Sequence, residues 1–300
     1  LLANKIIKIM IKLYNCDNAE LMAKMPDESI DVICIDPPYL YLKNQKLERV
    51  FDEKLFFSEC RRLLTKDGFI VMFGRGESFY RWNTILADLK FTFKEEIIWD
   101  KLYTSSPMMA LSRKHESISI FSKGNGSINK VKVSYEESRA FDYDSIINDL
   151  KKVKTVLSNK STLDAVEDYL TKGQLTYDGD YVSSTTITNG KRRVNRVVAV
   201  INAMEVGMNE KSIIKQTRDH YSSIHPTQKP VRLLERLLAL VIPDKPKEEI
   251  VVADFFGGSF STMEAVFNMG MQGISCEIDK EYFEAGKKRI ENLQPNLFTS

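Results

Sequence analysis

The sequence predicts an α/β protein built on a mostly parallel sheet with helices on both faces. Two observations lead to this fold class. Short apolar runs rich in β-branched residues alternate with amphipathic segments in both halves of the 300-residue chain. A central stretch without proline, between Pro107 and Pro226, separates the two alternating halves. The chain is therefore expected to be one α/β domain that carries a large insertion.

Six segments of the N-terminal half carry the alternating pattern. The run Asp31–Ile35 is a short apolar strand, and residues 52–64 place apolar side chains on one helical face before Asp67 and Gly68 end it. The next strand, helix and two strands are expected, in order, at Phe69–Phe73, Glu77–Leu89, Glu96–Trp99 and His115–Phe121. Strands of this kind, separated by helices, are typical of a sheet that is buried on both faces.

The C-terminal half repeats the alternation. Pro230 is expected to open a helix that runs to Val241. Proline is well tolerated in the first turn of a helix, because the N–H group that it lacks would have no helical partner there. The following strand, helix and strand are expected at Ile250–Ala253, Ser259–Asn268 and Ile274–Glu277. Asp279 caps a final helix that ends at about Leu293.

Composition excludes several classes of protein. Hydrophobic residues make up 43% of the chain and charged residues 28%, which excludes a disordered or collagen-like protein. A net charge of +2 means that any basic surface is local. No run of about 18 apolar residues is present, so no membrane partner is expected. The cysteines and histidines lack metal-binding spacings, so no metal is expected. The four scattered cysteines do not indicate a disulfide framework, which favours a reducing, cytoplasmic compartment. Met10 is the expected natural start, with residues 1–9 a remnant or an upstream extension.

The first candidate ligand site follows a buried strand in the C-terminal half. That strand ends near Asp254, and Gly257 and Gly258 then let the backbone turn sharply and approach a ligand. Glu277, at the end of the next strand, can accept both ribose hydroxyls of an adenosine. Because Phe260 replaces the third glycine of a dinucleotide-binding loop, the segment indicates an adenosine cofactor without phosphates. A corner whose glycines serve only packing is the alternative interpretation.

The second candidate site is the run from Asp36 to Tyr39, directly after a buried strand. Pro37 and Pro38 fix φ and lack amide donors, so the chain is stiff and its carbonyls stay available. This set suits an exocyclic amine, because Asp36 and a proline carbonyl accept its two N–H groups while Tyr39 stacks on the base. Such an amine is a poor nucleophile, and its methylation needs positioning and electrostatics more than a strong base. The alternative is a proline pair that only ends a strand.

These segments, in this order, resemble the β class of DNA amino-methyltransferases. Asp36–Tyr39 is similar to the catalytic motif, Asp254–Ser259 to the cofactor loop, and His225–Pro230 to the motif before the cofactor strand. The resemblance implies a Rossmann-like methyltransferase fold with a circularly permuted motif order, and S-adenosylmethionine as the methyl donor. Two departures lie in the cofactor loop, where Phe255 replaces the usual proline and Phe260 the last glycine.

The resemblance implies a role for each matching residue. The implied catalytic residues are Asp36, Pro37, Pro38 and Tyr39. The implied cofactor-binding residues are Asp17, Asp36, Thr227, Gln228, Lys229, Asp254, Phe256, Gly257, Gly258, Ser259 and Glu277. Of these, Asp17 is expected to reach the adenine amino group, Glu277 to bind the ribose, and Lys229 to hold the cofactor carboxylate by charge. Cys16 stands where the family has a glycine.

The resemblance also divides the chain. Residues 10–126 and 217–295 are expected to form the catalytic domain, and residues 127–216 an inserted target-recognition region. The candidate DNA contacts in the insert are Lys191, Arg192, Arg193 and Arg196. A solvated basic turn is the alternative interpretation of these cations. The expected partner is double-stranded DNA, from which the target base has to be flipped out. A homodimer and a partner restriction nuclease stay open as protein partners.

The identity of the methylated group depends on the first position of the catalytic motif. In the family, an aspartate there goes mostly with adenine N6 and a serine with cytosine N4, so Asp36 favours adenine N6. Cytosine N4, RNA methylation and an inactive DNA- or cofactor-binding module stay open, the last because of Phe255 and Phe260. Protein glutamine methylation is disfavoured, since family members of that kind carry asparagine at this position.

Overall fold

The chain divides into two compact units. One comprises residues 1–129 and 212–300, and the other residues 130–211. The computed structural model describes residues 10–39, 49–103, 110–140, 142–154, 160–173, 177–178, 193–194, 196–218 and 224–293. Within these ranges, no helix is both long enough and apolar enough to span a lipid bilayer.

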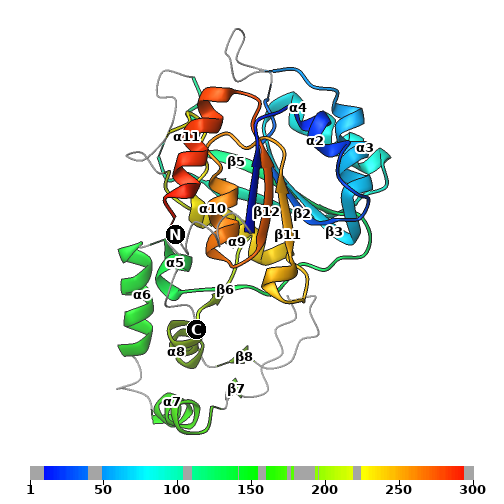
Figure 1. The fold of residues 1–300 in the computed structure, drawn as a ribbon. Coiled ribbons are helices and arrows are strands. Elements are labelled where there is room, and N and C mark those ends of the chain that lie inside the picture. Colours follow the sequence, from blue (N-terminus) through cyan, green and yellow to red (C-terminus); the bar gives the residue numbers. More distant parts are fainter. Residues whose placement is uncertain are drawn as a thin grey trace. The chain divides into compact units, whose positions relative to one another are not determined.

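A twisted sheet is the centre of the first unit (Figure 1). Its described strands, in spatial order, are β1 (Ile11–Tyr14), β12 (Gln272–Cys276), β11 (Val251–Asp254), β2 (Ile30–Ile35), β3 (Leu64–Gly74), β5 (His115–Ser122), β4 (Thr92–Asp100) and β10 (Ile213–Lys215). Strand β5 is antiparallel to both of its neighbours, and the other pairs are parallel. The predicted α/β class with a mostly parallel sheet is confirmed.

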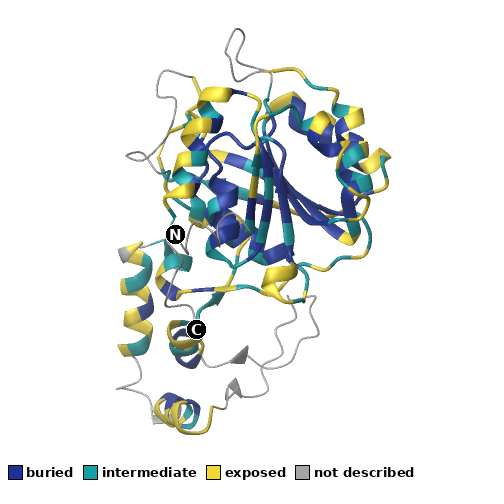
Figure 2. Ribbon diagram, viewed as in Figure 1, coloured by how far each residue is buried: buried dark blue, intermediate teal, exposed yellow. Residues whose placement is uncertain are grey.

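Helices cover both faces of this sheet (Figure 1). One face carries α2 (Asn18–Met22), α3 (Glu53–Leu63) and α4 (Gly76–Asp88), and the other α9 (Val231–Val241), α10 (Ser261–Asn268) and α11 (Lys280–Glu291). A 3₁₀ helix, η2 (Lys247–Glu249), precedes β11. Figure 2 shows the central strands buried between the two helical layers, and every residue of β2 is buried. This explains why β2 is a continuous apolar run rather than an alternating one.

The sequence contains the caps that begin several of these helices. Asp52 accepts a hydrogen bond from the Leu55 amide at 3.0 Å and caps α3. Asp279 accepts from the amides of Glu281 and Tyr282 and caps α11, as predicted. Pro230 precedes the first residue of α9, where its fixed φ is compatible with a helix start.

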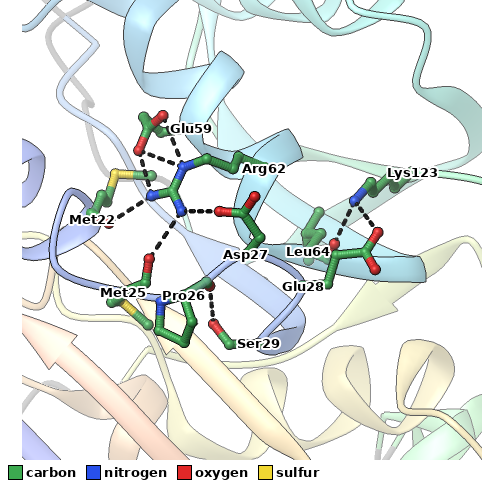
Figure 3. Close-up of polar contacts among 10 residues, drawn as sticks. All are labelled: Met22, Met25, Pro26, Asp27, Glu28, Ser29, Glu59, Arg62, Leu64 and Lys123. Atoms are coloured by element: carbon green, nitrogen blue, oxygen red, sulfur yellow. Dashed lines mark hydrogen bonds and ion pairs between the residues drawn. The ribbon is translucent and has the colours of Figure 1, made fainter.

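Arg62 on α3 connects that helix to the turn between α2 and β2 (Figure 3). Its guanidinium donates at 2.8 Å to the carbonyl of Met22, the last residue of α2, and at 2.9 Å to the carbonyl of Met25 in the turn. The Met22 carbonyl also accepts from the Met25 amide at 3.1 Å. It also pairs with Glu59 and Asp27, and the hydrogen bonds that it donates to both carboxylates raise its pKa further. The turn before β2 is therefore fixed, and with it the point at which β2 begins.

The second unit is a small helical body with two short antiparallel strand pairs. Its described helices are α5 (Tyr135–Arg139), α6 (Tyr143–Lys154), α7 (Lys160–Lys172) and α8 (Arg196–Val206). Its strand pairs are β6 (Lys132–Val133) with β9 (Met208–Asn209) and β7 (Tyr177–Asp178) with β8 (Arg193–Val194). Val166 and Tyr169 on α7 pack against Val197 and Val198 on α8. Residues 212–216, expected in the insert, belong to the first unit because β10 pairs with β4.

Candidate active site

Four carboxylates lie at the carboxyl ends of four neighbouring parallel strands. Asp36 directly follows β2 and Asp254 is the last residue of β11. Glu277 directly follows β12, and Asp17 follows β1 and caps α2. Because parallel strands end at one edge of a sheet, chain segments more than 200 residues apart in sequence meet there.

A cavity of about 610 Å³ opens at this edge. Every residue assigned to catalysis or to the cofactor lines it: Asp17, Asp36, Pro37, Pro38, Tyr39, Thr227, Gln228, Lys229, Asp254, Phe256, Gly257, Gly258, Ser259 and Glu277. The volume suits a ligand of cofactor size. The structure thus brings the two candidate sites of the sequence together in one cavity.

Glu277 organises the turn after β11. Its Oε2 accepts a hydrogen bond from the Gly258 amide at 2.8 Å, and its Oε1 accepts from the Asp279 amide at 2.7 Å. Each carboxylate oxygen has a second lone pair, so the group can still accept hydroxyl donors from a ligand. Gly258 has a φ of +51°, a conformation that favours glycine.

Phe260, one of the two departures in the loop, is a buried core residue. It has a φ of +55° immediately before α10, and its ring is fully buried. A Cβ on Gly257 would lie 2.3 Å from the ring, and a Cβ on Gly286 would lie 2.6 Å from it. Two glycines therefore make room for the phenylalanine, and the loop keeps its turn despite the missing glycine.

The catalytic segment is held by hydrogen bonds at both ends of Tyr39. The Tyr39 hydroxyl donates to Asp36 Oδ1 at 2.7 Å, and the Tyr39 carbonyl accepts from the Ser78 hydroxyl at 2.7 Å. The Tyr39 ring centroid lies 6.2 Å from that of Trp82. Since Pro37 and Pro38 restrict the intervening backbone, the carboxylate and the ring have a defined mutual orientation.

Charged residues that the sequence did not single out for the site surround Lys229 and Asp36. The Lys229 ammonium pairs with Asp36 Oδ2 and lies 3.5 Å from Glu116 Oε2. Glu116 Oε1 pairs with Lys101 at 2.5 Å and with Arg218 at 3.2 Å. Burial acts to raise the pKa of Glu116, but the three cations outweigh it and lower that pKa to about 2. Glu116 is therefore ionised across the physiological range.

The part of the cavity formed by Asp254 and the turn after β11 contains a carboxyl group with a raised pKa. Burial raises the pKa of Asp254 to about 7, although the Thr262 side chain and the Phe256 amide donate hydrogen bonds to it. The imidazole of His225 lies 4.4 Å from the Tyr282 ring, centroid to centroid, and burial lowers its pKa. A cation bound nearby would favour the ionised form of Asp254.

Gln228 and Thr227 lie beside this part of the cavity. Gln228 Oε1 accepts from the Ile224 amide at 3.2 Å, while its Nε2 is buried and has no hydrogen-bond partner among the residues that the structure describes. A buried donor of this kind in a cavity wall suits an acceptor on a ligand, such as a carboxylate. The Thr227 hydroxyl lies 3.1 Å from His225 Nδ1.

The four cations predicted to contact DNA lie in the second unit. Lys191 and Arg192 lie outside the described residues. Arg193 is the first residue of β8, and Arg196, which begins α8, is exposed. Their contact with DNA stays a prediction.

A family model described as a DNA methylase, of the N6/N4 methyltransferase type, matches residues 30–288. The chain belongs to the N6/N4 DNA methylase family. The matched range includes the catalytic segment, the cofactor loop and Glu277, and it leaves Asp17 outside. The expected resemblance to DNA amino-methyltransferases is confirmed.

Two curated relatives cover most of the methylase. It is 27% identical to the DNA adenine methyltransferase YhdJ of Escherichia coli (strain K12) over 288 residues, 90% of this chain and 79% of that protein. It is 25% identical to the type II methyltransferase M.HinfI of Haemophilus influenzae over 305 residues, 93% of this chain and 68% of that protein.

Solved structures share the fold of the methylase. The M1.HpyAVI–SAM complex superposes with a TM-score of 0.54 at 18% identity, covering 93% of this chain and 100% of that one. The PvuII DNA methyltransferase (cytosine-N4-specific) superposes with a TM-score of 0.58 at 15% identity, covering 96% and 88%. These likenesses confirm the predicted methyltransferase fold.

Proposed function

We propose that this methylase transfers the methyl group of S-adenosylmethionine to N6 of an adenine flipped out of duplex DNA. The observation that carries the proposal is the position of Asp36. Its carboxylate follows β2 and lines the same cavity as Glu277 and the Gly257–Gly258 turn. The methyl acceptor and the methyl donor are thereby assigned to two halves of one cavity. An aspartate rather than a serine at this position supports adenine N6 over cytosine N4.

The residues of the cavity fit S-adenosylmethionine. Glu277 has lone pairs left for the ribose hydroxyls after it accepts the Gly258 and Asp279 amides. The unpartnered Gln228 Nε2 and the Thr227 hydroxyl suit the carboxylate of the methionine part. Lys229, also expected there, pairs with Asp36 and lies 3.5 Å from Glu116 Oε2 in this structure. When bound, the cofactor supplies an electrophilic methyl group on a positively charged sulfur.

The remaining chemistry belongs to the chain's own residues. Asp36 and the Pro37 carbonyl accept the two N–H groups of the target amine, which holds the nitrogen lone pair toward the cofactor half. The Tyr39 ring replaces the stacking that the base loses when it leaves the helix. Because the amine is a weak nucleophile, positioning and electrostatics account for the rate more than a strong base does.

We assign target reading to residues 127–216. A separate unit that interrupts the catalytic unit in sequence, at residues 130–211, supports this assignment. Arg193, Arg196 and the neighbouring Lys191 and Arg192 would bind DNA phosphates or base edges, as lysine and arginine commonly do. Their contribution would be tested by the salt dependence of DNA affinity, which charge-removing substitutions reduce.

Mass spectrometry of nucleosides tests the proposal. Unmethylated duplex DNA is incubated with S-adenosylmethionine and either the wild type or Asp36→Ala. N6-methyladenine made only by the wild type supports the proposal. N4-methylcytosine instead would keep the mechanism and overturn the base assignment. Product from Asp36→Ala at the wild-type rate would overturn the role of Asp36, and methylation of matched RNA but not DNA would overturn the substrate.

A further inference from the structure

Both carboxylate oxygens of Asp36 already have partners. The Tyr39 hydroxyl donates to Oδ1 at 2.7 Å, and the Lys229 ammonium donates to Oδ2. The proposed function needs Asp36 to accept an N–H group of the target base. Each oxygen keeps a second lone pair, but an ammonium held on Oδ2 neutralises the carboxylate and weakens it as an acceptor for the target amine. Since Tyr39 is held on the short Pro37–Pro38 segment and by Ser78, Lys229 is the partner that can leave.

Lys229 cannot leave into water. Its side chain is 8% exposed, and an isolated buried ammonium is strongly unfavourable. Burial acts to lower the pKa of Lys229, but Asp36 and Glu116 outweigh burial and raise it. The group therefore stays charged and needs a second carboxylate within reach of Nζ.

Glu116 is a carboxylate in that position. Its Oε2 lies 3.5 Å from Lys229 Nζ, is buried, and accepts no hydrogen bond among the residues described. Its Oε1 pairs with Lys101 at 2.5 Å and with Arg218 at 3.2 Å. The carboxylate is thus held from one side and presents an open acceptor on the side that faces Lys229.

One aromatic ring, that of Trp99, lies against both cations on the Oε1 side. Lys101 Nζ lies 5.3 Å and Arg218 Cζ 5.8 Å from the centroid of the Trp99 ring, which is completely buried. Lys229 Nζ lies 5.0 Å from the centroid of a different ring, Phe73. The ion pairs distinguish Lys229, because of the described cations of this cluster it alone lies near two carboxylates, Asp36 and Glu116.

We propose that Glu116 is a positioning residue that receives the Lys229 ammonium when the amine of the target base takes its place on Asp36. The inference rests on the proposed function. No covalent bond changes in this step, because one buried cation moves between two carboxylates. In the free protein the charge of Lys229 balances the charge of Asp36. With the base bound, the charge of Glu116 balances the charge of Lys229. Glu116 never has to contact the base or the cofactor.

Glu116→Gln tests this role, because it keeps the shape of the side chain and removes its charge. Lys229 then stays on Asp36 and competes with the target amine. We expect kcat, normalised to the stoichiometry of cofactor binding, to fall roughly tenfold to a hundredfold. The dissociation constant for S-adenosylmethionine should change by less than about threefold. An unchanged normalised kcat would overturn the inference.

Asp31→Asn is a matched control. Asp31 is as buried as Glu116, each with a side chain 7% exposed, and it also pairs with a lysine, Lys245, at 2.8 Å. It lies near the start of β2, at the opposite edge of the sheet from the cavity. We expect this variant to lose thermal stability without a change in normalised kcat.

A second background separates positioning from a structural role. With Lys229→Met there is no ammonium to receive, so adding Glu116→Gln should leave normalised kcat unchanged from that of Lys229→Met. The double variant also restores the balance of buried charge if Glu116→Gln alone fails to fold. Equal losses from Glu116→Gln in both backgrounds would refute the inference. A wild type that methylates no nucleic acid would instead refute the proposed function.

Discussion

A Cβ atom placed on Gly286 would lie 2.6 Å from Cδ2 of Phe260 and 3.3 Å from the Gly258 carbonyl oxygen. Gly286 lies on α11, whereas Phe260 and Gly258 belong to the turn after β11. Gly286 therefore makes room for Phe260, which stands in the cofactor loop where the family usually has a glycine. Gly286 and Phe260 pack directly against each other, so the effect of a substitution at one position on stability should depend on the residue at the other.

Gly286→Ala should destabilise the methylase. The added methyl group overpacks a buried ring, which costs about 1–3 kcal/mol, and the better helix propensity of alanine offsets about 1 kcal/mol of this. The displaced turn should also weaken S-adenosylmethionine binding several-fold. Thermal unfolding and calorimetric titration measure the two effects. With Phe260→Leu in place, Gly286→Ala should cost less, and a rise in Tm in the wild-type background would refute the steric explanation.

Glu277→Gln should weaken binding of S-adenosylmethionine by roughly tenfold to a hundredfold. The amide has one acceptor oxygen instead of two, so either the Gly258 or the Asp279 amide loses its partner, and the ribose hydroxyls lose a charged acceptor. Titration calorimetry measures the change. Glu284→Gln, at an exposed position on α11, is the control and should bind as the wild type does. An unchanged dissociation constant for Glu277→Gln would contradict the ribose assignment.

The sequence predicted most of the first unit because its signals are local. Apolar runs, Asp52 and Asp279 as caps, and Pro230 at a helix start each depend on a few neighbouring residues. Strand β1 was not predicted, because four residues are too short a run to stand out and the strand is stabilised by pairing with β12. Strand β3 begins at Leu64 rather than Phe69, since pairing of Ile30 with Leu64 extends it.

The sequence predicted the site residues that belong to a recognisable motif. It missed the residues that reach the site only because of the direction in which a strand runs. Asp36, Asp254 and Glu277 follow strands that the sequence shows. Glu116 reaches the cavity because β5 is antiparallel, so that its first residues lie at the edge where its neighbours end. Nothing in a single sequence gives that direction. Lys101 belongs to the same edge through β4, and its role is visible only once both strands are placed.

Arg62→Met should destabilise the first unit by about 2 kcal/mol, because the Met22 and Met25 carbonyls lose charged donors and partial exposure limits the cost. We expect Tm to fall by roughly 4–8 °C. Arg62 lies outside the cavity, so kcat at 25 °C should not change. Lys54→Met, at an exposed position of the same helix, is the control and should leave Tm nearly unchanged. Loss of activity with an unaltered Tm would contradict this structural role.

Asp254 should make the methylase sensitive to pH near neutrality. Its pKa is about 7 in the folded protein and about 3.9 in an unfolded chain. The folded state thus favours the protonated form, so this contribution to stability is full below about pH 4 and is lost as pH rises through about 7. Asp254→Asn keeps an oxygen acceptor for the Phe256 amide and removes the titration. Its free energy of unfolding should vary less with pH than that of the wild type.

Cofactor binding should have the opposite dependence on pH. A positively charged ligand favours the ionised carboxylate of Asp254, so the dissociation constant for S-adenosylmethionine should decrease between about pH 6.5 and 8, by at most about tenfold per pH unit. Burial lowers the pKa of His225, so its imidazole titrates at lower pH than an exposed histidine does. Calorimetric titration at each pH measures the slope. Because Asp254→Asn removes the titrating group, its slope should be flat, and a slope equal to that of the wild type would assign the effect to another group.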